Sequence, residues 1–117
     1  FATACSVAQA NTPKQVEGVN LIPYLNGTNT GRPHETLFWR QGKKTAMRHG
    51  DWKLLRMGHR PGTDSDDGRG NSNWELYDLS QDISEATNLA TSCPQQLAEL
   101  ISRWEKMNGE MSEPLFR

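Results

Sequence analysis

Four short segments between residues 36 and 79 are predicted as β-strands: the first is rich in strand-forming residues, the second follows a glycine-containing turn, and the last two divide into alternating faces with the two-residue period of a strand. Both alternating faces of the third segment carry apolar side chains, so we expect that strand to lie inside a sheet. Glycine-containing turns separate the first three segments, and such turns are typical of hairpins. The pattern predicts a four-stranded antiparallel sheet with strands at residues 36–40, 45–48, 52–57 and 74–79.

The C-terminal part of the chain has the period of a helix instead. One apolar stripe recurs at spacings of three and four residues, and it consists of Leu97, Leu100, Ile101, Trp104 and Met107. Pro94 suits the first turn of a helix, and Asn108-Gly109 predicts its end. We therefore expect an α+β fold, in which one long C-terminal helix packs on the sheet.

The first 35 residues are organised differently. Residues 1–10 have apolar positions at helical spacing but no N-cap ahead of them, so they predict the last turns of a truncated N-terminal helix. Pro13 ends that helix, because the residue before a proline avoids the helical region. Residues 11–35 form a connector that contains one helical turn at 21–25. The predicted organisation is a helix end at 1–10, the connector at 11–35 and the α+β part at 36–117.

Composition narrows the function classes. The chain has 117 residues, enough for one domain or part of one, and 34% of them are hydrophobic, which allows a modest core. The formal net charge of −1 gives no field for nucleic acid or an anionic membrane surface. Apolar runs fall far short of the roughly 20 residues that span a bilayer. We expect neither nucleic acid nor membrane as a partner.

The sequence gives only weak signals for a metal site or a disulfide bond. Cys5 and Cys93 are most simply two small buried thiols, with a disulfide between them as the second alternative. The three histidines lack a metal-ligand spacing. An EF-hand loop starting at Asp64 would place Gly68 where a ligand belongs, so a solvated acidic loop is the better interpretation. The sequence predicts no metal site.

A series of segments nevertheless resembles a known family. In order, they are Gly18–Gly27, Leu37–Arg40, Ala46–Leu54, Glu75–Asp82 and Glu85–Ala90. Their order and spacing resemble the C-terminal subdomain of the arylsulfatase-type sulfatases, within the alkaline phosphatase-like superfamily. The resemblance covers essentially the whole chain.

This resemblance implies a parent enzyme that hydrolyses sulfate esters with a formylglycine nucleophile and a calcium-type ion. Residues 1–10 would be the end of the last helix of a large catalytic domain, and residues 36–117 the subdomain that completes the fold and borders the substrate cleft. The implied partners are that large domain and a sulfated small molecule or glycan. The family is often exported, to the periplasm or outside the cell.

The departures from the family decide what is expected of this chain alone. The formylglycine precursor precedes x-Pro-Ser-x-Arg in the family, whereas Cys5 precedes Ser6-Val7-Ala8-Gln9. Asp66-Asp67 is similar to the family's paired aspartates but lies in polar, glycine-rich sequence. No catalytic or metal-binding residue is assigned, and we expect the isolated chain to be inactive.

Four residues are expected to face the substrate: Lys43, Lys44, His59 and Arg60. Lysines in a hairpin turn are most simply solubilising charges, with an anion contact as the alternative. Arg40 and Arg48 flank that turn, and an ion pair within the fold is a better interpretation for them than a fork that holds sulfate. Asn26-Gly27-Thr28 fits the N-glycosylation acceptor pattern, which is a common match.

A second hypothesis belongs to another class. The chain would be a non-catalytic binding or interaction module derived from a sulfatase tail, with an apolar face that seeks a partner or self-associates. The four tryptophans are expected in the core, although the absence of a large domain would leave one of them exposed. Sedimentation separates a self-associating fragment from a clean monomer or defined oligomer.

Overall fold

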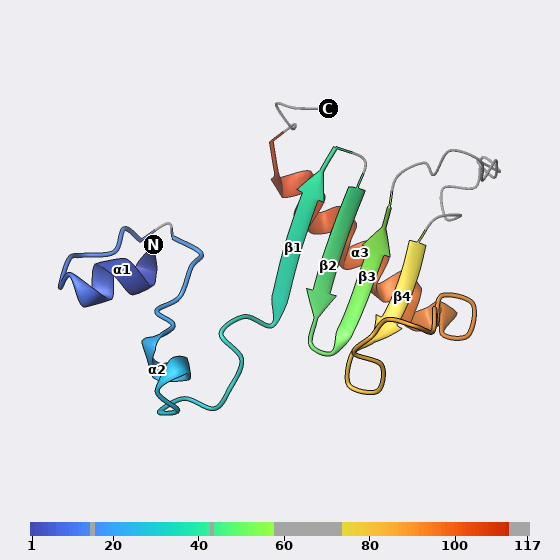
Figure 1. The fold of residues 1–117 in the computed structure, drawn as a ribbon. Coiled ribbons are helices and arrows are strands. Elements are labelled where there is room, and N and C mark those ends of the chain that lie inside the picture. Colours follow the sequence, from blue (N-terminus) through green and yellow to red (C-terminus); the bar gives the residue numbers. More distant parts are fainter. Residues whose placement is uncertain (15, 43, 58–73, 113–117) are drawn as a thin grey trace. The chain divides into compact units, whose positions relative to one another are not determined.

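The computed structural model describes residues 1–14, 16–42, 44–57 and 74–112. The chain divides into two compact units, at residues 1–35 and 36–117. Two short helices belong to the first unit and the sheet with its long helix to the second (Figure 1). The predicted α+β class is confirmed, as are the four antiparallel strands, the long C-terminal helix and the short N-terminal helix.

The first unit contains helix α1 (Ala2–Val7) and helix α2 (Ile22–Leu25). Two polar side chains of α1 hold the segment that leads into α2. The hydroxyl of Thr3 donates to the carbonyl of Val19 and accepts from the amide of Leu21 at 3.0 Å, and the Ser6 hydroxyl accepts from the Asn20 side chain at 2.9 Å. Hydrogen bonds between exposed groups therefore organise much of this unit.

The sheet of the second unit is a simple meander in the order β1-β2-β3-β4, in which every neighbouring pair is antiparallel. A meander needs only short connections, which is consistent with the glycine turns of the sequence. Gly50 has a φ of 59° in the turn between β2 and β3, a conformation that glycine adopts without steric cost. The strands are β1 (Thr36–Gln41), β2 (Lys44–His49), β3 (Trp52–Arg56) and β4 (Trp74–Asp78).

Helix α3 (Pro94–Glu110) lies across one face of this sheet, running from the β4 side to the β1 side (Figure 1). Its predicted stripe is confirmed, because Leu100 and Trp104 are buried and the other three members pack against the core. The buried sheet residues beneath it are Met47, Leu54, Trp74 and Leu76. Three of these, Met47, Leu54 and Leu76, pair directly across the central strands, so their side chains form one continuous row.

Helix α3 ends at Glu110, one residue beyond the predicted stop at Asn108-Gly109. Arg40 stabilises this end, since its guanidinium donates to the side-chain oxygen of Asn108 and to the carbonyl of Ser112. A cation here also interacts favourably with the negative end of the helix dipole. A contact between β1 and α3 thus supports the helix past the local signal to stop.

The outer edge of β4 is covered by the segment that follows it. The Leu76 amide donates to the side-chain oxygen of Asn88 at 3.1 Å, and the Leu76 carbonyl accepts from the Leu89 amide at 2.8 Å. An unpaired strand edge is a template for aggregation, and such bonds remove it.

Candidate functional site

The face of the sheet opposite α3 is the candidate functional surface, because it combines exposed apolar side chains with a hollow. Strand geometry sends alternate residues to this face, including Leu37, Trp39, Ala46 and Leu55. Trp39 is 53% exposed, Leu37 38% and Met57 44%. We call this surface the open face.

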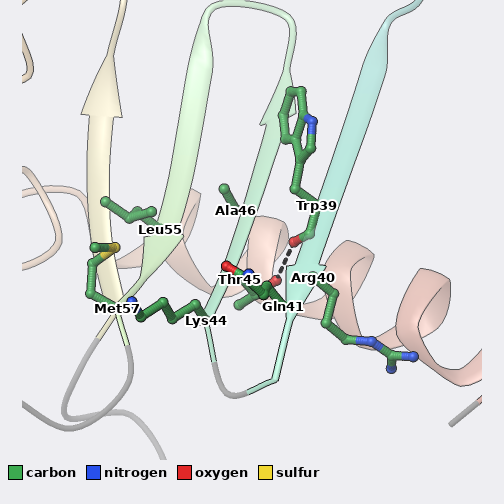
Figure 2. A pocket seen from close by; sticks show the side chains of 8 residues that line it. All are labelled: Trp39, Arg40, Gln41, Lys44, Thr45, Ala46, Leu55 and Met57. Carbon is green, nitrogen blue, oxygen red and sulfur yellow. Dashed lines mark hydrogen bonds between the residues drawn. The ribbon is translucent and has the colours of Figure 1, made fainter. Parts of the chain in front are cut away.

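A hollow of about 360 Å³ lies toward the end of the open face where β1 finishes (Figure 2). Register explains it, because Trp39 pairs with Ala46, which pairs with Leu55. The small Ala46 side chain leaves a gap with Trp39 on one side and Leu55 and Met57 on the other. The hollow therefore has apolar walls, with Lys44 and Gln41 at the hairpin end.

One hydroxyl group joins the open face to the core. Thr45 is buried between the open face and the core. Its Oγ1 donates a hydrogen bond to the carbonyl of Trp39 at 3.0 Å. The same oxygen accepts a hydrogen bond from Nε1 of Trp104 at 2.6 Å. A threonine hydroxyl can donate and accept at once, so it satisfies both groups. The backbone under the hollow is thereby fixed to α3.

The other end of the open face is covered instead of hollow. Tyr77 points to this face and yet is only 8% exposed. Lys53, its cross-strand neighbour, forms an ion pair at 2.6 Å with Glu85 in the segment after β4. Burial, followed by a hydrogen bond from its hydroxyl to Glu75, raises the pKa of Tyr77 to about 12. This end of the open face is therefore covered and carries charged side chains, whereas the other end is exposed and apolar.

The loop that carries Glu85 is shaped by its own hydrogen bonds. The Asp82 carboxylate accepts from the amide of Thr87 at 2.8 Å and from the hydroxyl of Ser84 at 2.8 Å. Bonds from the loop amides, that of Thr87 first, lower the pKa of Asp82. The carboxylate therefore serves the local turn.

Of the four residues predicted to face substrate, the structure describes Lys44 alone. Lys44 is exposed and lies at the hollow. Lys43, His59 and Arg60 lie outside the described residues. The acidic residues between 58 and 73 fall outside them as well. The structure therefore places one predicted cation beside an apolar hollow and leaves the grouping of all four untested.

The two arginines beside the hairpin hold the fold together. Arg40 turns away from the open face toward the end of α3, where it binds Asn108 and Ser112. Arg48 donates from Nε to the carbonyl of Gly50 at 3.1 Å. Arg56 lies over two rings of the core, 4.5 Å from the centroid of Trp74 and 4.8 Å from that of Trp104, and burial lowers its pKa.

Five residues that line the hollow were not singled out by the sequence analysis: Gln41, Thr45, Ala46, Leu55 and Met57. Alternation placed Leu55 and Met57 on one face of a strand but could not say which face a helix covers. Trp39 was expected in the core, with exposure as the exception, and the structure places it on the open face. The sequence did contain one useful signal. It predicts one long amphipathic helix, and one helix covers one face of a sheet, so the other face is expected to be open.

Among residues 1–14, 16–42, 44–57 and 74–112, no three or more His, Cys, Asp or Glu side chains gather as metal ligands. Both cysteines are free thiols. Within the same part of the chain, no helix has the length and apolar character needed to cross a bilayer.

No family model matches the chain. Several solved structures share its fold. Ps i-CgsB has a TM-score of 0.68 at 20% identity, over 98% of this chain and 24% of that protein. A second match is a Bacteroides thetaiotaomicron protein labelled 6S-sulf, from a locus for metabolism of multiple glycosaminoglycans. Its TM-score is 0.66 at 23% identity, and the match covers 92% of this chain and 23% of that protein. A putative sulfatase from Bacteroides thetaiotaomicron has a TM-score of 0.60 at 21% identity, and the match covers 94% of this chain and 25% of that protein.

These matches establish similarity of fold. This chain is similar to sulfatases along nearly its whole length, and it spans about a quarter of the length of the solved structures that it matches. The sheet and its single covering helix are therefore an arrangement that occurs as a small part of much larger proteins.

Proposed function

We propose that this chain is the C-terminal, accessory part of a sulfatase, an enzyme that hydrolyses sulfate esters. The observation that carries the proposal is the coverage, since almost all of this chain matches about a quarter of proteins named as sulfatases. The order of the sequence segments, from Gly18–Gly27 to Glu85–Ala90, supports the same assignment. Residues 1–10 would then end the large domain, residues 11–35 would connect it, and residues 36–117 would form the accessory subdomain.

The reactive groups would lie in the large domain. Sulfate ester hydrolysis needs an activated nucleophile, cations around the sulfate and a proton donor for the leaving group. The described residues do not fit a formylglycine or a calcium-type ion, because Cys5 lacks the flanking proline and arginine and the acidic side chains are not grouped as ligands. No catalytic step is therefore assigned to this chain.

The role of this chain would be to complete the fold and to border the substrate cleft. The open face supports this role, because Trp39, Leu37 and Met57 leave an apolar surface that is costly in water. The large domain is the partner that would cover it. Lys44, together with Lys43, His59 and Arg60, would contribute positive charge where the cleft begins.

The substrate would be a sulfated small molecule or glycan. Neighbours with the same fold include a 2-O GAG sulfatase and a protein in complex with its substrate D-glucosamine-2-N,6-O-disulfate. Ps i-CgsB is known in complex with k-i-k-neocarrahexaose. Export from the cytoplasm belongs to the same proposal, because sulfated glycans of this kind lie outside cells.

The coding sequence upstream of Phe1 provides a direct test. The proposal predicts a longer open reading frame that contains a Cys- or Ser-x-Pro-Ser-x-Arg run. A frame that continues into an unrelated domain would contradict the proposal and favour a stand-alone binding module. A frame that starts at residue 1 with no large domain would have the same meaning.

A further inference from the structure

The chain contains two Asn-Gly pairs, at Asn26-Gly27 and Asn108-Gly109. In such a pair the backbone nitrogen of glycine can attack the side-chain carbonyl carbon of asparagine, since glycine has no Cβ to obstruct the approach. An apolar residue precedes each pair, Leu25 in one case and Met107 in the other, whereas Thr28 follows the first pair and Glu110 the second. The two sites also differ in the structure around them.

Asn26 is exposed and lies just after the last residue of α2. Gly27 has a φ of 76°, and no heavy atom of a residue other than its two chain neighbours lies within 4 Å of the position that a Cβ would occupy. The space around Gly27 is therefore open to a five-membered ring. A four-residue helix also opens readily, so the backbone can reach the geometry of attack.

The side-chain oxygen of Asn26 already accepts two hydrogen bonds from Thr28. The Thr28 amide donates to it at 3.0 Å and the Thr28 hydroxyl at 2.6 Å. This oxygen gains negative charge when a nucleophile adds to the carbon beside it. Two donors aimed at a developing oxyanion lower the barrier to that addition.

Asn108 is held in the opposite way. It is part-buried inside α3, and its side-chain oxygen accepts a hydrogen bond from the Arg40 guanidinium. The amide of Gly109 belongs to the same helix, where amides donate to the carbonyl four residues earlier. Attack by this nitrogen requires the helix end to open, and the bonds from Arg40 to Asn108 and Ser112 hold that end closed.

We propose that Asn26 is a site of spontaneous deamidation and that Asn108 is protected by the fold. The bond from the Gly27 nitrogen to the Asn26 Cγ forms as the bond from Cγ to Nδ2 breaks. The proton of the Gly27 amide passes through solvent to the leaving nitrogen, which departs as ammonia. Water then opens the succinimide ring and yields aspartate or isoaspartate, with no oxidant or cofactor.

The product changes the first unit in two ways. A neutral side chain becomes negative at the C-terminal end of α2, where the helix dipole opposes negative charge. The isoaspartate form also adds one carbon to the backbone between Asn26 and Gly27. Its free carboxylate is the group that an isoaspartyl methyltransferase modifies, so this enzyme serves as a probe.

The test is peptide mapping by mass spectrometry after incubation of the folded chain at neutral and mildly alkaline pH. We expect the peptide with Asn26 to accumulate aspartate and isoaspartate about tenfold or more faster than the peptide with Asn108, a ratio that corresponds to a barrier difference of about 1.4 kcal/mol or more. Methyl transfer to the peptide that contains Asn26 should follow the same time course, and Asn26→Gln should abolish it there.

Two controls separate structure from local sequence. In urea the two rates should converge, because both pairs then have free backbones. Arg40→Gln should accelerate the reaction at Asn108 and leave Asn26 unchanged. Equal rates in the folded chain, or a ratio that persists unchanged in urea, would overturn the proposal.

Discussion

Trp104 in helix α3 donates a hydrogen bond of 2.6 Å to the hydroxyl of Thr45 in strand β2. Thr45 in turn donates to the carbonyl of Trp39, whose side chain forms one wall of the hollow on the open face. The core and the candidate surface therefore share one buried hydroxyl. Its removal tests whether this link stabilises the fold.

Thr45→Val keeps the shape of the side chain and removes both hydrogen bonds. The indole N–H of Trp104 is then left buried without its acceptor, which costs about 1–3 kcal/mol of unfolding free energy. Urea denaturation followed by tryptophan fluorescence measures the change. Thr91→Val is the matched control, since Thr91 is exposed. Equal midpoints for the two variants would show that the bond contributes nothing.

Leu100→Ala tests the packing of α3 on the sheet. Leu100 is fully buried in the core cluster, and truncation of such a residue costs about 2–5 kcal/mol. A small domain has about 5–15 kcal/mol in total, so far-ultraviolet circular dichroism in urea should show a much lower midpoint. Ala98→Ser, on the exposed side of the helix, should leave the midpoint close to that of the parent. A Leu100→Ala midpoint as high as that of the parent chain would contradict the burial of Leu100 in the core.

Tyr77 predicts a loss of stability at alkaline pH. Its pKa is raised to about 12 in the folded chain, above the ordinary value of 10.0, so the folded state holds the proton more tightly than the unfolded state. The stabilising contribution is complete below pH 10, and it is lost as the pH rises from 10 to about 12. Urea titrations at several pH values in this range should show a falling free energy of unfolding, and Tyr77→Phe should remove the part of the fall that Tyr77 causes.

Absorbance gives an independent measure of the same group. The chain has two tyrosines, so Tyr24→Phe leaves Tyr77 as the single one. Its phenolate should form with a midpoint of about 12 in the folded chain, and near 10 in urea. A midpoint near 10 in both conditions would mean that the segment after β4 does not cover this side chain.

Trp39 predicts the behaviour of the isolated chain in solution. Its exposed ring and the neighbouring Leu37 and Met57 should drive self-association when nothing covers the open face. Sedimentation velocity should show concentration-dependent association for the parent chain and much less for Trp39→Ser. Ile83→Ser is the control, because Ile83 is 80% exposed in the segment after β4 and away from the hollow. A strictly monomeric parent chain would favour an evolved stand-alone module.

The elements of this fold could be predicted from local patterns. Strand-forming residues, glycine turns and alternation located all four strands to within one residue at each end, and the stripe from Leu97 to Met107 located the helix. These signals are strong because each segment must bury one face. The helix ends one residue later than predicted, and the contact from Arg40 to Asn108, which stabilises that end, joins residues far apart in sequence.

The candidate surface was harder to predict for a physical reason. Alternation separates two faces of a strand, but it does not say which face the single helix covers. Trp39 therefore looked like a core residue until the pairing with Ala46 placed it beside a gap. The bonds from Asn88 and Leu89 to the β4 edge also join distant residues and leave no periodic signal. Lys44 is exposed and lies at the hollow, and its contact with sulfate stays a prediction.

The central claim is that this chain serves a catalytic domain that lies outside it. The most direct measurement is sulfate release from sulfated sugars by three proteins: the isolated chain, the longer polypeptide encoded with it, and that polypeptide lacking residues 36–117. The account predicts sulfate release by the longer polypeptide, a strong loss when residues 36–117 are removed, and none by the isolated chain. Turnover by the isolated chain that is abolished by substitution of one of its own residues would contradict the account.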